Sequence, residues 1–286
     1  MTTTLATRLA FTVDAPRLAA ATAWVARHIS ARPQVAVLGG IRLDLADREL
    51  TISAFDYDVS ATWRLDVNAD PDCRASALVS GRLLAELVKT FPDKPVNVTA
   101  DDAALSVVCA SVKLTLPLMA VDEYPTLPTV ADAIGVVDGE VLAAAAERVV
   151  PATVGAALAE LTGVHATWAA DGVRLIGTDA YRFALASIDW RPAGPNVDAV
   201  TLVPGAVLAD VARAFADEPD VQVGATEGLI SFTAGARTVV SRLLAAEQHR
   251  GADEIPAPSS REAPHDAECW RVHAPCLARR VRKALA

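Results

Sequence analysis

The sequence predicts an α+β fold in which two copies of one domain follow each other, each with two helices packed on antiparallel sheets. The first observation is a repeat: FTVDAPRLAA (11–20) returns in similar form as VVDGEVLAAA (136–145). The second is that LVSGRLLAELVKTFPDKP (78–95) returns as LVPGAVLADVARAFADEP (202–219), with 8 of 18 positions identical. Val13 and Asp14 correspond to Val137 and Asp138, and 78 corresponds to 202, so both pairs share an offset of 124 residues and the repeating unit is long enough to be a domain.

Each copy begins with a strand and a helix. In the first copy, LAFTVD (9–14) alternates apolar and polar residues, as a half-buried strand does. We expect Asp14 to cap the helix that follows, and Pro16 suits its first turn. The helix is indicated by apolar residues that recur at helical spacing, namely Leu18, Ala21, Val25 and Ile29.

The rest of the copy is expected to contain three strands, a second helix and three more strands. After Arg32 and Pro33 come three runs typical of strands, QVAVLGGIRLDLA, ELTISAF and DVSATWRLDV. A second helix is expected at about 81–91, with an apolar side made of Leu83, Leu84, Leu87, Val88 and Phe91. VNVTAD, ALSVVCA and KLTLPL then alternate again, and the second copy repeats this order from about residue 134.

These elements divide the chain into two domains and a remainder. We expect the first domain over residues 1–128 and the second over 129–250. A polar segment rich in Pro and Ser follows at 251–270 and is typical of a linker. RVHAPCLARR (271–280) is similar to the opening of the other copies, so 271–286 is expected to begin a truncated third domain.

Composition and charge disfavour several classes of protein. Hydrophobic residues make up 52% of the 286 residues, which is typical of a globular chain and not of a disordered one. No apolar run approaches the ~18–20 residues of a membrane span and no export signal is recognised, so we expect a cytoplasmic protein with reduced thiols and no membrane partner. The formal net charge of -9 disfavours nucleic acid as a partner, unless basic residues gather on one face.

No pattern typical of catalysis is found in the sequence. It has no phosphate-binding glycine loop, nucleophile elbow or HExxH motif, so we expect neither an enzyme nor a cofactor. Asp56, Asp58 and Asp179 fall in turns, where aspartate favours the backbone geometry. One cluster has ligand types that zinc accepts, but its spacing differs from that of metal fingers and chance is favoured; it comprises His265, Cys269, His273 and Cys276.

Five stretches carry a more specific signal: ARPQVAVLGGIRL (31–43), SAFDYDVSA (53–61), LVSGRLLAELVKTFPDKPV (78–96), MAVDEYPTLP (119–128) and GTDAYRFALA (177–186). Together they resemble the bacterial DNA polymerase III beta sliding clamp, over roughly residues 7–247. The resemblance implies tandem DNA-clamp domains in a ring that encloses duplex DNA without sequence specificity. It also implies a replication processivity factor, which tethers DNA polymerase and is not an enzyme.

A sliding ring needs weak phosphate contacts, which Arg and Lys side chains on its inner helices supply. The candidates by position are Arg17, Arg27, Arg32, Arg82, Lys89, Arg148 and Arg213. Arg32 and Arg82 also fall where the resemblance implies DNA contacts. The alternative is that these are ordinary solvated charges. In the second domain VGAA (154–157) replaces the loop of Arg32 and Pro33, which weakens the expectation of DNA contact there.

The resemblance further implies a groove in which peptides of DNA polymerase and of the clamp loader dock. Its share from the second domain falls on Leu161, Thr178, Ala180, Tyr181, Arg182 and Phe183. An extended peptide with apolar anchors fits such a groove. The alternative is structural, because Leu161 and Phe183 also suit core positions of strands and Arg182 can simply hold the turn.

The resemblance ends after SRLLAAE (241–247), where a family member continues into a third domain. Family dimers pair the first domain with the partner's third domain, so we expect a monomer or weak association and not the family's homodimer. The alternative function is that of a clamp paralogue, which binds peptides or ligands as a decoy module without closing a ring. A decayed copy without activity is the remaining alternative.

Overall fold

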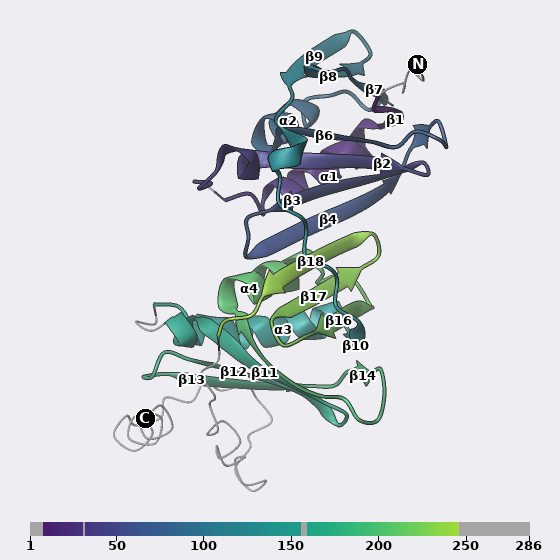
Figure 1. Cartoon of the computed structure of the whole chain (residues 1–286). Coiled ribbons are helices and arrows are strands. Elements are labelled where there is room, and N and C mark those ends of the chain that lie inside the picture. Colours follow the sequence, from purple (N-terminus) through teal and green to yellow (C-terminus); the bar gives the residue numbers. More distant parts are fainter. Residues whose placement is uncertain (1–7, 31, 156–158, 246–286) are drawn as a thin grey trace, which may run out of the picture. The chain divides into compact units, whose positions relative to one another are not determined.

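The computed structural model describes residues 8–30, 32–155 and 159–245. The chain divides into two compact units, Met1–Thr129 with Gly235–Val240 and Val130–Ala234 with Ser241–Ala286. Figure 1 labels most of the helices and strands of both units. The segments 251–270 and 271–286 lie outside the described residues, as does the cluster of His265, Cys269, His273 and Cys276.

The first unit is built from two antiparallel sheets and two helices. Its elements are β1 (Ala10–Asp14), α1 (Ala15–Ala26), η1 (Ala36–Gly39), β2 (Gly40–Ala46), β3 (Glu49–Phe55), β4 (Val59–Asp66), β5 (Asn68–Ala69), β6 (Ala75–Ser80), α2 (Gly81–Val88), β7 (Pro95–Ala100), β8 (Ala104–Cys109), β9 (Val112–Pro117) and η2 (Val121–Glu123). One sheet has the order β5-β1-β7-β8-β9, and β4-β3-β2-β6 are consecutive neighbours in the other. All of these pairings are antiparallel.

The two helices of the first unit lie side by side against the strands β2, β3, β4 and β6. The residues predicted at helical spacing form the buried side of α1: Leu18 is 2% exposed, and Ala21 and Val25 are 0% exposed. The strands supply equally buried residues, such as Leu43 and Ile52. Burial of this apolar surface is what holds α1 on the sheet.

The second unit repeats this architecture. Its elements are β10 (Ala133–Val137), α3 (Gly139–Val149), η3 (Val150–Ala152), η4 (Ala159–Thr162), β11 (Gly163–Ala169), β12 (Gly172–Thr178), β13 (Phe183–Ile188), β14 (Arg191–Pro192), β15 (Asp198–Pro204), α4 (Gly205–Ala214), β16 (Val221–Ala225), β17 (Leu229–Ala234) and β18 (Arg237–Arg242). One sheet has the order β13-β12-β11-β15, and β14-β10-β16-β17 are consecutive neighbours in another. Most of β18, residues 237–240, belongs to the first unit, as does Ala236 just before it, whose backbone oxygen accepts the N–H of Arg64 at 3.0 Å.

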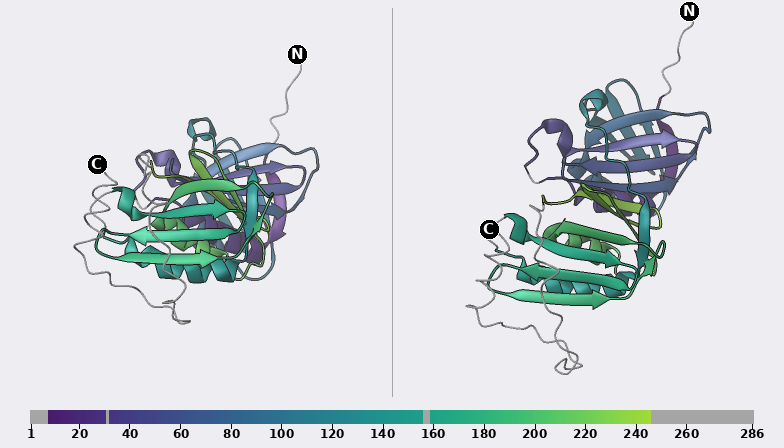
Figure 2. Two further views of the ribbon diagram at one scale, coloured as in Figure 1. Left: turned by 90° about the horizontal axis from the view of Figure 1, so that it is seen from below. Right: turned by 60° about the horizontal axis from the view of Figure 1, so that its bottom comes forward.

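Helices α3 and α4 also lie side by side, and both contact the sheet of β11, β12, β13 and β15. Figure 2 shows these long strands and the helices beside them from two further directions. The predicted α+β class, with tandem domains of two helices on antiparallel sheets, is therefore confirmed. In the described part of the chain, no helix is both long and apolar enough to cross a membrane.

The start of α1 corrects the prediction of a capping aspartate. Asp14 occupies the N-cap position, but its side chain makes no capping hydrogen bond. In the second unit, Asp138 accepts hydrogen bonds from the N–H groups of Glu140 and Val141. Position 16 of the first unit is a proline, which has no N–H, so the donor that Glu140 supplies is missing there.

Two boundaries differ from those expected. The run at 34–46 begins as the helix η1, and only Gly40–Ala46 forms a strand. Pairing with β6 starts at Gly40 opposite Ser80, and the chain turns into α2 directly after Ser80, so a strand extended before Gly40 would have no partner on that side. Helix α2 ends at Val88 and not near 91: the N–H groups of Thr90 and Phe91 donate three residues back, to Leu87 O and Val88 O, and Pro92 disfavours a helical conformation at Phe91.

Residues 119–128 fold back onto the first unit. Met119 N–H donates to Leu78 O at 2.8 Å. Tyr124 is 5% exposed and packs in a cluster with Val37, Phe55 and Leu78. Burial raises the pKa of the Tyr124 hydroxyl from 10.0 to about 12, because the ionised phenolate loses its hydration in this apolar site. The segment that the sequence singled out is thus anchored by one buried tyrosine.

We expect this tyrosine to make the first unit sensitive to alkali. Because the folded pKa of about 12 lies above the usual value of 10.0, the stabilisation by neutral Tyr124 is complete below pH 10 and is lost as the pH rises toward 12. A Tyr124→Phe variant should therefore lose less free energy of unfolding over that interval than the wild-type protein. Urea unfolding across the interval measures this, and equal losses in the two proteins would contradict it.

Candidate DNA and partner interfaces

Four basic residues lie on the exposed sides of α1 and α2. Arg17 is in the first turn of α1 and Arg27 is its C-cap, whereas Arg82 is in the first turn of α2 and Lys89 is its C-cap. All four are exposed, because the opposite side of each helix carries its buried apolar residues. The two helices and their C-caps contain one carboxylate, Glu86. This pair of helices therefore carries a surplus of positive charge.

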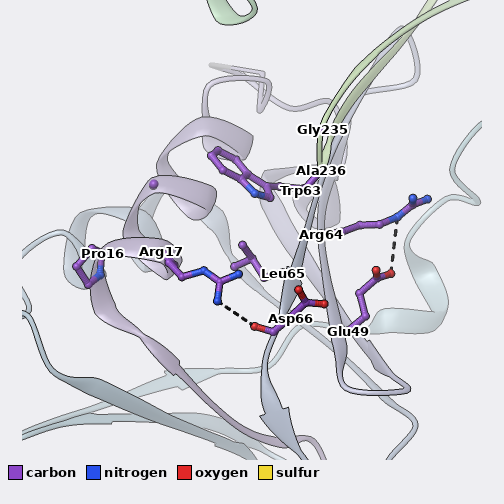
Figure 3. A pocket seen from close by; sticks show the side chains of 10 residues that line it. Pro16, Arg17, Glu49, Trp63, Arg64, Leu65, Asp66, Gly235 and Ala236 are labelled. Carbon is purple, nitrogen blue, oxygen red and sulfur yellow. Dashed lines mark hydrogen bonds and ion pairs between the residues drawn. The ribbon is translucent and has the colours of Figure 1, made fainter. Parts of the chain in front are cut away.

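Arg17 lines a groove of about 700 Å³ in the first unit, together with Trp63, Arg64 and Asp66. Its Nη1 donates to the backbone oxygen of Asp66 at 3.4 Å, and Figure 3 shows the side chain reaching from α1 toward the end of β4. Arg64 points instead toward Glu49, with 3.8 Å between Nε and the carboxylate. One long hydrogen bond leaves most donors of the Arg17 guanidinium available to a phosphate.

Arg82 and Arg32 are connected through the loop that follows α1. Arg82 Nη2 donates to Ile29 O at 3.3 Å and to Ser30 O at 3.2 Å. Arg32 is exposed, and its backbone N–H donates to Ser30 Oγ at 3.3 Å. The sequence predicted only a direct DNA contact for Arg82. Its hydrogen bonds to the backbone oxygens of Ile29 and Ser30 could not be predicted from the sequence.

The helices of the second unit offer no such surplus of positive charge. Arg148 is exposed in the last turn of α3, and Arg213 is exposed in the last turn of α4. Arg213 Nη1 donates to Asp210 Oδ1 at 3.0 Å, which offsets its charge. Glu140 and Glu147 on α3 bring the carboxylates of the two helices to three, against two cations. Among the seven basic candidates, Arg213 therefore agrees best with the alternative that the side chain is an ordinary surface charge and not a DNA contact.

The turn between β12 and β13 brings four of the six predicted groove residues together. Thr178 Oγ1 donates to Arg182 O at 2.7 Å and accepts the N–H of Ala180 at 3.1 Å. Ala180 adopts the left-handed conformation, with φ 75°. Tyr181 follows with 81% of its surface exposed. The turn therefore exposes the aromatic ring of Tyr181 to solvent, and the side chain of Thr178 holds the turn's backbone.

Asp179 is the centre of this turn, although it was not among the predicted groove residues. Its Oδ1 accepts the N–H groups of Tyr181 at 2.9 Å and of Arg182 at 2.7 Å, and its Oδ2 accepts Arg182 Nε at 2.9 Å. Partial burial by itself would raise the pKa of Asp179, but these hydrogen bonds outweigh it and hold the pKa below its usual range. Arg182 Nη2 also donates to Val154 O at 3.4 Å.

The remaining groove candidates are less exposed. Leu161 lies in η4, and Phe183 is the first residue of β13; both are half-buried. This burial is compatible with a groove wall and with the structural alternative. Val154, which the sequence analysis did not select, is 64% exposed and lies beside the turn through the bond from Arg182. In the sequence, Val154 is only the first residue of VGAA, the segment that replaces the loop of Arg32 and Pro33.

The first unit contains a counterpart of this turn. Asp56 Oδ1 accepts the N–H groups of Asp58 at 3.1 Å and of Val59 at 2.8 Å, and Tyr57 is left-handed, with φ 77°. The expectation that Asp56 and Asp179 serve turn geometry agrees with these bonds. What distinguishes the second unit is the aromatic side chain at 181 and the arginine at 182, where the first unit has Asp58 and Val59.

Both units match known family models. Residues 9–128 match the DNA polymerase III beta subunit, N-terminal domain, and residues 137–248 match its central domain. The chain is 41% identical to a Beta sliding clamp of Streptomyces coelicolor over 238 residues, which are 81% of this chain and 63% of that protein. It is 35% identical to a Beta sliding clamp of Micrococcus luteus over 240 residues, which are 83% of this chain and 77% of that protein.

Solved structures share the fold. The DNA polymerase sliding clamp of Bacillus subtilis matches with a TM-score of 0.79 at 22% identity, over 88% of this chain and 68% of that one. The DNA polymerase III subunit beta of Pseudomonas aeruginosa matches with a TM-score of 0.79 at 20% identity, over 88% and 69%. The chain thus spans under two thirds of the Streptomyces coelicolor relative, but it carries both of the matched domains. It belongs to the family of the DNA polymerase III beta subunit, the bacterial beta sliding clamps.

Proposed function

We propose that the chain works as part of a replication processivity clamp, which encloses duplex DNA and tethers DNA polymerase to it. The observation that carries the proposal is the surplus of positive charge on α1 and α2, in a chain 41% identical to a Beta sliding clamp. Arginine and lysine side chains bind phosphates without regard to sequence, and such contacts are weak and salt-dependent. That is the kind of contact that permits sliding.

The acidity of the whole chain is compatible with this role. The formal net charge is -9, whereas the exposed sides of α1 and α2 present Arg17, Arg27, Arg82 and Lys89 against Glu86. A local basic surface attracts DNA even on an acidic protein, because screening limits the reach of more distant charges to about 10 Å. The role requires no catalytic group, and we place it in the cytoplasm, where replication takes place.

The partner side of the proposal is the turn around Tyr181. Peptides of DNA polymerase and of the clamp loader would dock here, with apolar anchors against Tyr181 and the neighbouring Val154. Both are highly exposed, at 81% and 64%. Asp179 and Arg182 hold the turn before any peptide binds, which lowers the entropy cost of association.

A second candidate is a clamp paralogue that binds peptides or ligands as a decoy without closing a ring. It is favoured by the contrast within the second unit, where Asp179 holds the turn through the N–H groups of Tyr181 and Arg182, while α3 and α4 carry more carboxylates than cations. In that case peptide binding would persist without retention on DNA.

Retention on circular DNA separates the two candidates. A clamp should stay on a nicked circle, with a clamp loader and ATP present, and be released when the circle is cut, because only topology holds it. A decoy should bind a clamp-binding peptide of DNA polymerase in fluorescence anisotropy but show no retention on the circle. Tyr181→Ala should weaken the peptide complex by about tenfold or more in either case, since exposed aromatic anchors dominate such contacts. A folded protein that shows neither peptide binding nor retention on the circle would contradict both candidates.

A further inference from the structure

We infer that Arg82 acts on DNA binding through the loop that carries Arg32: its guanidinium fastens this loop to the start of α2 and so positions Arg32 for a phosphate. The inference rests on the proposed DNA-facing role of the first unit and deepens it. Arg82 is then a positioning residue, which the sequence pattern places among the direct contacts. Its two hydrogen bonds to backbone oxygens carry the inference.

Arg82 bonds to the chain just beyond the end of α1. The helix ends at Ala26, and Ile29 N–H continues it with a turn hydrogen bond to Ala26 O at 3.2 Å. Backbone oxygens beyond this point have no helical donor to pair with. Arg82 Nη2 supplies one to both Ile29 O and Ser30 O. A cation at the C-terminal end of a helix also complements the helix dipole, so the contact is favoured twice.

Apolar side chains are also in contact at the start of α2. Gly81 is the first residue of α2, and a Cβ added there would collide with Ile29 Cδ1 and lie 2.7 Å from Ile41 Cγ1. Ile29 is 5% exposed, so its side chain is packed directly on the start of α2. Polar and apolar contacts thus hold the chain at Ile29 and Ser30. Arg32 lies two residues after Ser30, and its N–H donates to Ser30 Oγ.

The second unit provides an internal control, because the duplication repeats the start of α2 at the start of α4. Gly205 corresponds to Gly81, and Thr153 corresponds to Ile29. A Cβ added at Gly205 would lie 2.6 Å from Thr153 Oγ1. The close approach of the helix start therefore recurs. The position of Arg82, however, is taken by Ala206. The fold accommodates alanine at this site, and the arginine occurs in the unit whose loop carries Arg32.

The fastening itself can be tested without DNA. In an Arg82→Ala variant, the backbone N–H groups of Ile29 and Arg32 should exchange with solvent about three- to tenfold faster than in the wild-type protein, because local opening becomes easier. Lys89→Ala is the matched control, since it removes a cation from the same exposed side of α2 without touching the loop. Unchanged exchange in Arg82→Ala, measured by NMR in the full chain, would overturn the inference.

Its transmission to DNA is tested by a double-mutant cycle. We expect Arg32→Ala and Arg82→Ala each to weaken binding of a labelled short duplex by about three- to tenfold at low salt, the range for one lost phosphate contact. The variant with both changes should bind within about twofold of Arg32→Ala, because a positioning residue has nothing left to position. Combining Lys89→Ala with Arg32→Ala should instead multiply the two losses.

The possible outcomes are distinct. A multiplied loss for Arg82→Ala and Arg32→Ala together would show that Arg82 contacts phosphate on its own, which overturns the inference but leaves the proposed function intact. An Arg32→Ala variant with wild-type affinity would overturn the inference too, because nothing then depends on the position of Arg32. If Lys89→Ala also binds normally, the failure extends to the proposed DNA-facing role of the first unit.

Discussion

Reversal of three cations on the first unit should nearly abolish binding to duplex DNA. In a variant with Arg17→Glu, Arg27→Glu and Lys89→Glu, three phosphate contacts are lost and three repulsive carboxylates are added. We expect the affinity at low salt to fall by about 100-fold or more. The slope of log K against log salt should become shallower, by about three units. Fluorescence anisotropy of a labelled short duplex over a series of salt concentrations measures both quantities.

The second unit provides the matched control for this experiment. Arg148→Glu combined with Arg213→Glu should weaken binding by about threefold or less, because nonspecific attraction there is already offset by the carboxylates of α3 and α4. Far-ultraviolet circular dichroism should be unchanged in both variants, since all of the altered side chains are exposed. Equal losses of affinity in the two variants would contradict a DNA surface concentrated on the first unit.

Gly139→Ala should cause a large loss of stability in the second unit. Gly139 is the first residue of α3, and a Cβ added there would collide with the backbone oxygen of Phe215 and lie 2.7 Å from Glu218 O. Its N–H donates to that same Glu218 O at 2.9 Å, so the two segments cannot move apart without losing this bond. We expect the free energy of unfolding to fall by about 2–3 kcal/mol.

Urea or thermal unfolding measures this loss, and Gly194→Ala is the matched control. A Cβ added at Gly194 meets no atom within 4 Å, so its effect should stay below about 0.5 kcal/mol. The first unit has Ala15 at the position of Gly139, where the corresponding bond to Lys94 O is longer, at 3.2 Å. A Gly139→Ala variant as stable as the Gly194→Ala control would contradict the close packing of Gly139 against the backbone of Phe215 and Glu218.

Features that depend on neighbours in the chain were predictable from the sequence. The apolar spacing of Leu18, Ala21 and Val25 indicated α1, and these residues are buried. The aspartates at 56 and 179 indicated turns, and each accepts backbone N–H groups two and three residues further on. Such patterns can be recognised in a sequence because the residues that form them are close together along the chain.

Features that depend on distant partners were not predictable. From the sequence, Arg82 and Arg213 were both predicted to be basic helix residues that contact DNA. The first bonds to backbone oxygens beyond α1 and the second to an aspartate one turn away on its own helix. Which charges are engaged thus depends on how the helices pack.

The sequence by itself determined the duplication, the α+β class and the resemblance to the clamp family, because repeats and periodic burial are written in the order of residues. The tertiary structure alone decided which basic side chains are free and which hold the fold. Arg82 meets Ile29 O across 53 positions of the chain, and Arg17 meets Asp66 O across 49. A hydrogen bond requires its atoms to lie within about 3.5 Å, and separations this long along the chain become short only when helices and sheets have packed.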